Sequence, residues 1–206
     1  MSIVKLSNNG VKNATAFGSI TGLGSMTFIK KLTASSSATL SFVNGASGVV
    51  LDNTYKEYLF TFKNIHPEED NRNFGFTLST DGGSNYNVPK TTTIFYAYHD
   101  ETDGYSGLTY HTGKDLAEGT GNQMVLVETG NDNDQSGSGY LRLFDPASTT
   151  FVKNFISVGN SYEATNNSQN SFVAGYGNTA SAVNAIQFSM SSGNTDSGDI
   201  CLYGIA

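Results

Sequence analysis

The sequence lacks several features that would assign it to a common class. It has no tryptophan, three prolines and a single cysteine, Cys201, in 206 residues. One cysteine excludes a disulfide framework, and we expect Cys201 to be a small buried apolar side chain. Charged residues make up 14% of the chain, against about 25% in ordinary globular domains. The Ala-, Glu-, Lys-, Leu- and Arg-rich composition of coiled coils is absent as well.

Positive charge and long apolar runs are also scarce. Arginine occurs only at Arg72 and Arg142, and the formal net charge is −7. Because phosphate binding needs clustered Lys and Arg, we expect no nucleic-acid partner. No apolar run approaches the roughly 20 residues of a transmembrane helix, and residues 1–9 lack the apolar core of a signal peptide. We therefore expect no membrane partner.

Short alternating apolar runs dominate what is present. Tyr58, Phe60 and Phe62 alternate with more polar residues, which is the period of a strand with one buried face. Residues 123–128 are almost continuously apolar, which predicts a strand covered on both faces. The glycines of Asp81-Gly82-Gly83 predict a tight hairpin. In all, about eleven strands are expected from twelve candidate runs, of which 105–111 and 171–176 are the weaker ones. The runs are residues 26–33, 38–43, 58–62, 74–78, 93–98, 105–111, 123–128, 140–144, 151–156, 171–176, 185–190 and 200–205.

These runs predict an all-β fold. No convincing amphipathic helix is present, and residues 180–186 allow one or two helical turns at most. Many short strands with Gly-rich turns are typical of an antiparallel β-sandwich, and a jelly roll is the commonest such fold at this length. We assign residues 26–206 to the sandwich. Residues 1–25 are either a disordered tail or an extended N-terminal arm on a neighbouring subunit, and we expect the anchoring arm.

The three histidines do not form a recognisable catalytic pattern. His66, His99 and His111 lie outside any nucleophile elbow, and we expect them in loops or at strand ends. His99, together with Asp100, Glu101 and Asp103, could converge with His111 on a metal ion. However, no His-x-His or His-Glu-x-x-His spacing supports such a site. We therefore expect no metal centre and no cofactor.

One loop imitates the start of a calcium-binding loop. Asp132 and Asp134 are followed by Ser136-Gly137, but Leu143 occupies the twelfth position, where an EF-hand carries a bidentate Glu. A solvated hairpin loop explains this segment better. Whether Asp132 and Asp134 bind calcium stays open.

Two dense acidic groups and a set of tyrosines are the remaining candidates for chemistry. The acids are Glu68-Glu69-Asp70 and the pair Asp115 and Glu118, all in expected loops, so we expect no enzymatic activity. Exposed tyrosines with Asn and Asp are typical of sugar-binding sandwiches, although a role in packing is more common. The candidate rings are Tyr86, Tyr96, Tyr98, Tyr105, Tyr110, Tyr162 and Tyr176.

Four segments resemble structural proteins of marine tailed bacteriophages. They are IVKLSNNGVKN at residues 3–13, TFIKKLTASSS at 27–37, FGFTLSTDGGSNY at 74–86 and GDICLYGI at 198–205. The resemblance covers most of the chain and is strongest in residues 1–90 and 185–206. It carries no catalytic motif. It implies a virion protein assembled in the host cytoplasm, with other virion proteins as partners, a homo-oligomer (a trimer is our first expectation) and a host-surface glycan as a further partner.

Together these features predict a non-enzymatic virion structural protein, part of a tail fibre or other surface appendage anchored by residues 1–25. A capsid head-decoration or cement protein is the nearest alternative, and copy number per particle separates the two. A free carbohydrate-binding module is a third alternative. A polysaccharide depolymerase that uses Asp115 or Glu118 ranks last.

Overall fold

A computed structural model describes residues 26–206, and these residues form twelve β-strands. They form no helix at all, and so none that could cross a bilayer. The all-β prediction is confirmed, and every expected strand is present, most of them a few residues longer than expected. The strands are β1 (Met26–Ser37), β2 (Leu40–Val43), β3 (Glu57–Pro67), β4 (Arg72–Ser79), β5 (Lys90–Asp100), β6 (Ser106–Tyr110), β7 (Gln123–Thr129), β8 (Gly137–Phe144), β9 (Lys153–Tyr162), β10 (Asn167–Gly177), β11 (Ala185–Met190) and β12 (Thr195–Ile205).

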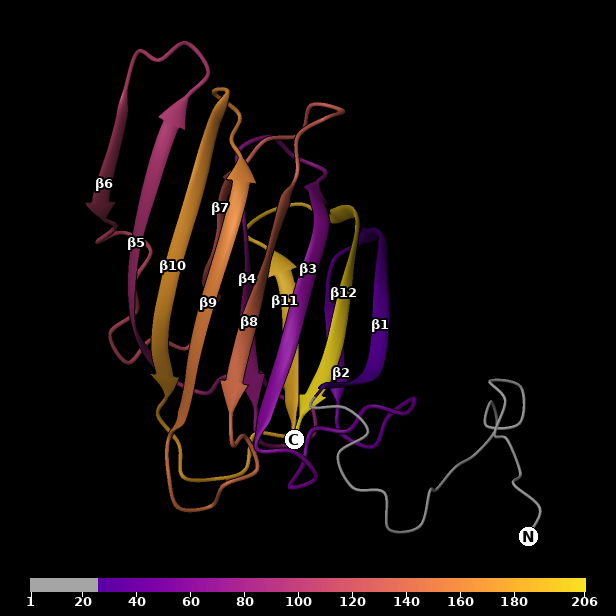
Figure 1. Cartoon of the computed structure of the whole chain (residues 1–206). Helices are drawn as coiled ribbons and strands as arrows, with labels where there is room; N and C mark the ends of the chain where they lie inside the picture. The colour runs from indigo at the N-terminus through magenta and orange to yellow at the C-terminus, as the bar shows by residue number, and fades with distance from the viewer. Residues whose placement is uncertain (1–25) are drawn as a thin grey trace, which may run out of the picture.

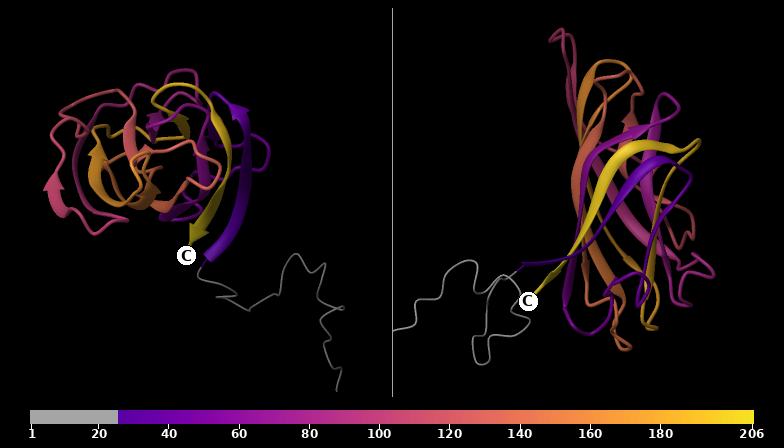
Figure 2. Two further views of the ribbon diagram at one scale, coloured as in Figure 1. Left: turned by 90° about the horizontal axis from the view of Figure 1, so that it is seen from above. Right: turned by 90° about the vertical axis from the view of Figure 1, so that its right-hand side faces the viewer.

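Two antiparallel sheets pack face to face, as predicted for a β-sandwich (Figures 1 and 2). The larger sheet has eight strands in the order β1-β12-β3-β8-β9-β10-β5-β6. The smaller sheet has the order β2-β11-β4-β7. Each of its strands is preceded and followed in the chain by strands of the larger sheet. The chain therefore passes back and forth between the two layers.

An aromatic cluster fills the space between the sheets. Tyr58, Phe60 and Phe62 of β3 are buried, so the period-two prediction for this strand is confirmed. Phe188 of β11 lies at the centre of the cluster, with its ring centroid 5.4–6.3 Å from five other phenylalanine rings. Those rings belong to Phe42, Phe60, Phe62, Phe74 and Phe76. The apolar run of β7 is also covered on both faces, as predicted.

The larger sheet extends beyond its partner through β5 and β6 (Figure 1). Strand β7 lies against β9 and β10, whereas the segment after β6 covers the first half of β5. There Lys90 pairs with Gly119, and the Leu116 backbone N–H donates to Thr92 Oγ1 at 2.8 Å. The second half of β5 has no such cover on its inner face. This uncovered part of the sheet holds the candidate site.

Several sequence expectations need correction. Gly82 and Gly83 do adopt positive φ, at 72° and 83°, but their turn closes no hairpin because β4 and β5 belong to different sheets. Residues 180–184 are irregular rather than helical. Cys201 is half-buried on the outer face of the larger sheet instead of lying in the core. The expected arm, residues 1–25, lies outside the described residues.

Candidate functional site

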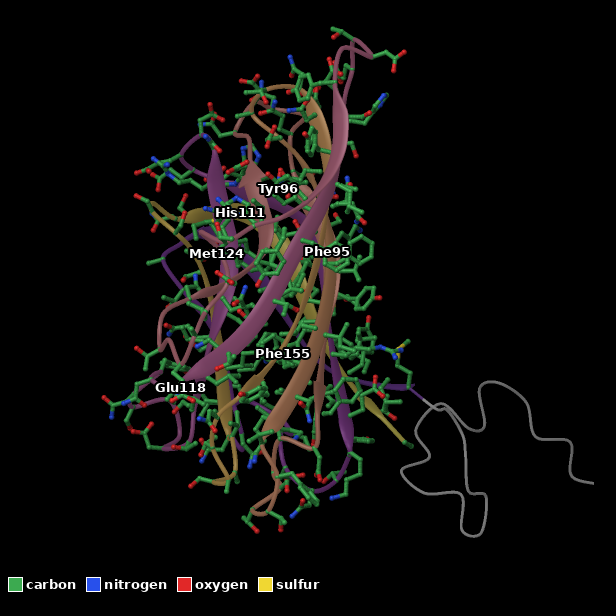
Figure 3. The ribbon with its side chains drawn as sticks, turned by 90° about the vertical axis from the view of Figure 1, so that its left-hand side faces the viewer. Phe95, Tyr96, His111, Glu118, Met124 and Phe155 are labelled. Atoms are coloured by element: carbon green, nitrogen blue, oxygen red, sulfur yellow. The ribbon has the colours of Figure 1, made fainter. Side chains whose placement is uncertain are left out.

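Strand β5 sends its side chains alternately to the two faces of the larger sheet. Phe95 points to the outer face, whereas Tyr96 points to the inner face, beside His111 and on the side of Met124 (Figure 3). The inner face carries a cleft of about 230 Å³, which we call the inner cleft. Its lining residues are Tyr96, Tyr98, Tyr105, Glu163, Thr165, Asn167 and Gln169.

A row of aromatic rings forms one wall of the inner cleft. The Tyr98 ring centroid lies 5.8 Å from that of Tyr105 and 5.7 Å from that of Tyr96, which in turn is 5.3 Å from His111. Gly107 of β6 permits this arrangement, because a Cβ at that position would lie 2.7 Å from Tyr98 Oη. The row presents amphipathic rings, each with an apolar face and a polar edge.

Asp100 fixes the turn that carries Tyr105. Its carboxylate accepts a hydrogen bond from the Tyr105 backbone N–H at 2.7 Å and others from the Thr102 hydroxyl and backbone. The Thr102 hydroxyl and then the Tyr105 N–H hold the pKa of Asp100 below its ordinary value. The carboxylate therefore stays ionised and holds Tyr105 at the edge of the cleft before any ligand arrives.

Two glutamates meet at the far wall of the inner cleft. The end of β7 reaches Glu163 through an isolated bridge between Thr129 and Glu163, which brings the Glu128 and Glu163 carboxyl groups within hydrogen-bonding reach. Burial and the neighbouring Glu128 raise the pKa of Glu163, although a hydrogen bond from Asn167 opposes them. Burial would also raise the pKa of Glu128, but hydrogen bonds from Glu163 and Lys114 lower it.

The surroundings of Glu128 fix its position. Lys114 Nζ lies 3.1 Å from Glu128 Oε1, and Asn73 Oδ1 accepts from both Lys114 Nζ and the Glu128 backbone N–H at 3.0 Å. Glu128 has φ of 54°, a conformation that costs a non-glycine residue about 1–3 kcal/mol.

Strand β10 contributes a row of buried polar atoms without partners. Asn167, Gln169 and Ser171 face inward at successive positions and are 3%, 1% and 1% exposed. Within the described residues, Asn167 Oδ1, Gln169 Nε2 and Ser171 Oγ have no hydrogen-bond partner. Such atoms are uncommon in native proteins and need a specific explanation. Asn167 and Gln169 line the inner cleft, so it holds an unsatisfied acceptor beside an unsatisfied donor.

The opposite face of the same sheet is exposed and apolar. Residues 26–206 have eleven large apolar side chains that are well exposed, and eight of them lie on the outer face of the larger sheet. We call these eight the outer belt. They are Met26, Phe28, Phe95, Leu108, Tyr110, Tyr140, Ile156 and Phe172.

The strand register aligns the outer belt across the sheet. Tyr110, Phe95 and Phe172 are direct neighbours on successive strands, and Val158 continues the row to Tyr140. The Phe95 and Phe172 rings stack with their centroids 5.0 Å apart. Beside this ridge lies a hollow of about 500 Å³ whose lining includes small and apolar residues. Among them are Thr93, Phe144, Ile156, Ala174 and Gly175.

The tyrosines proposed from the sequence are only partly brought together. Tyr96, Tyr98 and Tyr105 share the inner cleft. Tyr110 lies on the outer belt and donates to Asp115 at 2.7 Å, and Tyr162 donates to Glu101 at 2.9 Å. Tyr176 lines the outer hollow, and Tyr86 contacts the Gly83 turn.

The histidines do not converge. His66 contacts the Gln135 carbonyl at 2.8 Å, and His99 contacts Asp103 at 3.0 Å on the outer side of the sheet. His111 lies on the inner side, where burial and then the Lys114 charge lower its pKa. The structure therefore does not bring His111 together with His99 and its neighbouring acids.

The described part of the chain holds no group of three or more His, Cys, Asp or Glu side chains placed to share a metal ion. In the calcium-like loop, the Gln135 backbone N–H donates to the Asp132 carbonyl at 2.9 Å, and Gln135 Oε1 accepts from the Asp132 N–H at 3.1 Å. Asp134 lines a separate polar hollow with Asp196. Turn-closing hydrogen bonds thus account for this loop.

The acidic groups singled out in the sequence are engaged in loops. Glu69 pairs with Arg72 at 2.8 Å, while Glu68 and Asp70 accept hydrogen bonds from loop backbone groups. Asp115 accepts from Tyr110 and Glu118 accepts from Asn178, so these two acids have different partners.

The acids that do meet, Glu128 and Glu163, were not among the sequence candidates. They lie 35 positions apart, and neither belongs to a motif. Lys114, Asn167 and Gln169 were missed for the same reason. The alternation of polar residues along β10 was the one available signal, since it places Asn167 and Gln169 on one face.

Comparison with known proteins gives no further guidance: no family model, no curated protein and no solved structure matches this chain.

Proposed function

We propose that this chain is a non-enzymatic structural subunit of a tailed-phage particle, part of a fibre or other surface appendage, and that it associates with further copies of itself through the outer belt. The phage assignment rests on the sequence resemblance in residues 1–90 and 185–206. The association rests on one observation, the exposed apolar face of the larger sheet.

The area of the outer belt supports self-association. Its eight side chains are 36–70% exposed. Taking about 200 Å² for a whole side chain of this size, their exposed parts amount to about 780 Å². A stable interface takes about 800 Å² from each partner, whereas the largest apolar patch of a typical monomer is about 300–600 Å². The stacked rings of Phe95 and Phe172 project beside the hollow, so the face offers a ridge and a recess that two copies could fit together.

The charge on the outer face also favours association with a second copy of this chain. Two copies of a chain with net charge −7 repel each other unless the contact surface is neutral. On this face Arg142 lies 3.2 Å from Glu57, and Lys31 lies 3.2 Å from Asp199. These two pairs are compensated within one copy, which reduces the repulsion that a second copy meets on this face.

We also infer that the sandwich is a jelly roll. Without β5, β6, β9 and β10, the strand orders reduce to β1-β12-β3-β8 and β2-β11-β4-β7. Eight strands that alternate between two four-stranded sheets in this way are typical of a jelly roll. The other four strands are then two insertions that widen one sheet, and they carry the inner cleft and five of the eight residues of the outer belt.

Sedimentation equilibrium of the full chain tests the assembly. We expect a mass about three times the 21.9 kDa of one chain, since a closed ring of three is our expectation for a fibre subunit. Ile156→Glu, at the middle of the belt, should give monomers. Phe151→Glu, a matched change in a loop where the side chain is 68% exposed, should leave the mass unchanged. A monomeric wild type, or equal masses for both variants, would contradict the proposal.

Immunogold labelling of phage particles tests the location. Labels on a tail or collar, at few copies, are the expected result. Labels over the whole shell, in numbers matching the shell subunits, would favour the head-decoration alternative. Absence from purified particles would overturn the virion assignment altogether.

A further inference from the structure

We propose that the inner cleft binds the ring of a neutral saccharide, with Tyr98 as the stacking surface and Gln169 and Asn167 as partners for its hydroxyl groups. This inference does not depend on the proposed assembly, because the cleft and the outer belt lie on opposite faces of the larger sheet.

The unpartnered atoms of β10 define the kind of ligand. Gln169 Nε2 can only donate and Asn167 Oδ1 can only accept, and both residues are more than nine-tenths buried in the wall of one cleft. A simple ion of either sign satisfies one of these atoms and leaves the other unpaired. A hydroxyl group donates and accepts, so neighbouring hydroxyls on one ring satisfy both.

The aromatic wall defines the shape of the ligand. Tyr98 lies directly opposite Gln169 in the strand register, and both residues line the inner cleft. Tyr105 is 48% exposed at the mouth and extends the apolar surface outward. A flat aromatic surface with a few convergent polar groups suits a ring that is apolar on its faces and polar at its edge. At about 230 Å³ the cleft is smaller than a drug-sized pocket, so we expect one sugar ring to enter it.

The carboxyl groups exclude one class of saccharide. Glu163 lines the cleft and Glu128 lies next to it, whereas Lys114 is the cation paired with Glu128. No cation among the described residues lines the cleft itself. A uronic or sialic acid would therefore find no cation to pair with in the cleft, whereas a neutral ring needs none.

Saturation-transfer difference NMR on the full chain tests the inference, because the signal reports ligand C–H groups close to protein protons. The probes are glucose, galactose, mannose and N-acetylglucosamine, with glucuronic acid as the acidic comparison. We expect at least one neutral probe to bind in the millimolar range, and glucuronic acid to bind at least tenfold more weakly.

Three variants locate the site. Tyr98→Ala and Gln169→Leu should each weaken binding at least tenfold, and Tyr140→Ala, on the outer face, should leave it unchanged. Gln169→Leu removes an unsatisfied buried amide, so its melting temperature should equal or exceed that of the wild type. Loss of binding in a stable Gln169→Leu variant cannot then be ascribed to unfolding.

The inference is overturned if none of the four neutral probes binds, if binding survives in both cleft variants, or if glucuronic acid binds as well as the neutral probes. Sedimentation of the same samples separates this result from the assembly, because Tyr98→Ala and Gln169→Leu leave the outer belt intact. A failed sugar titration with an intact oligomer rejects the cleft alone.

Discussion

The two halves of the eight-stranded sheet share one backbone architecture but bury different chemistry. Strands β1, β12, β3 and β8 face the second sheet with Phe60, Phe62, Leu141 and Leu202. Of fourteen buried polar or charged residues in the described chain, nine lie on β5, β9 and β10. Those nine are Lys90, Thr92, Asp100, Lys153, Ser157, Ser161, Asn167, Gln169 and Ser171.

The difference follows from what covers each half. The smaller sheet covers the inner faces of β12, β3 and β8, so apolar burial stabilises the fold there. In the second half β7 lies against β9 and β10, and a short segment covers only the first part of β5. Polar groups can persist in this half because a cleft reaches them. The first half therefore buries mainly apolar side chains, whereas the second half buries most of the polar ones.

The largest expected effect lies in the aromatic cluster, which the first half of the larger sheet shares with the smaller sheet. Phe188→Ala removes the ring that contacts five other phenylalanines, and we expect a loss of about 3–5 kcal/mol in the free energy of unfolding. Phe151→Ala, in an exposed loop, should stay within about 0.5 kcal/mol of the wild type. Urea unfolding measures both. A loss of under 1 kcal/mol for Phe188→Ala, on the order of a surface change, would show that the cluster is not what stabilises the fold.

The next largest effect is a gain in stability, and it lies in the second half of the larger sheet, which buries most of the polar residues. Lys90 is fully buried, its ammonium donates only to the Val88 carbonyl, and burial lowers its pKa to about 8. Holding this lysine charged at pH 7 destabilises the folded state, so Lys90→Met should raise the free energy of unfolding by about 2–3 kcal/mol. Lys153→Met is the matched control with a smaller gain, because the Lys153 ammonium donates to two carbonyls.

The same lysine gives the wild type a pH dependence. Above pH 8 the folded protein releases the Lys90 proton, while the unfolded chain keeps it up to the ordinary pKa of about 10.4. Because the unfolded state then binds more protons, stability should rise between about pH 8 and pH 10. Denaturant unfolding at several pH values measures this rise. Equal slopes for wild type and Lys90→Met would contradict it.

The smallest effect compares two buried serines of the polar half. Ser171 Oγ has no partner, whereas Ser157 Oγ donates to the Tyr140 carbonyl at 2.7 Å. We expect Ser171→Ala to raise the free energy of unfolding by about 1 kcal/mol and Ser157→Ala to lower it by about 1 kcal/mol. Thermal melts of the two variants and the wild type measure both changes in stability. An equal loss of stability in both variants would show that Ser171 Oγ has a hydrogen-bond partner in solution.

The sequence predicted the aromatic cluster better than the polar half. Tyr58, Phe60 and Phe62 show strict alternation, and residues 185–190 are β11 without any shift in bounds. Strand pairing was not predictable, because alternation gives the buried face of a strand but does not identify its neighbours. For example, alternation does not predict that β5 lies beside β10 in the larger sheet.

The inner cleft could not be predicted for a related reason. Tyr96 and Tyr98 were candidates, and their shared face follows from the strand period. Their partners Glu128 and Glu163 come from other strands, and only the bridge at Thr129 brings the two acids together. The unpartnered state of Gln169 depends on every neighbouring strand, so no local pattern reveals it.

Alkylation of an introduced cysteine tests most directly whether the outer belt joins copies of this chain. In a Cys201→Ser background, which removes the only native thiol, Ile156→Cys places a thiol at the centre of the belt and Phe151→Cys places one in an exposed loop. Maleimide labelling is then timed at low and high protein concentration. We predict that labelling of Ile156→Cys slows at high concentration, while Phe151→Cys reacts at a constant rate. Rates independent of concentration for both would contradict the account.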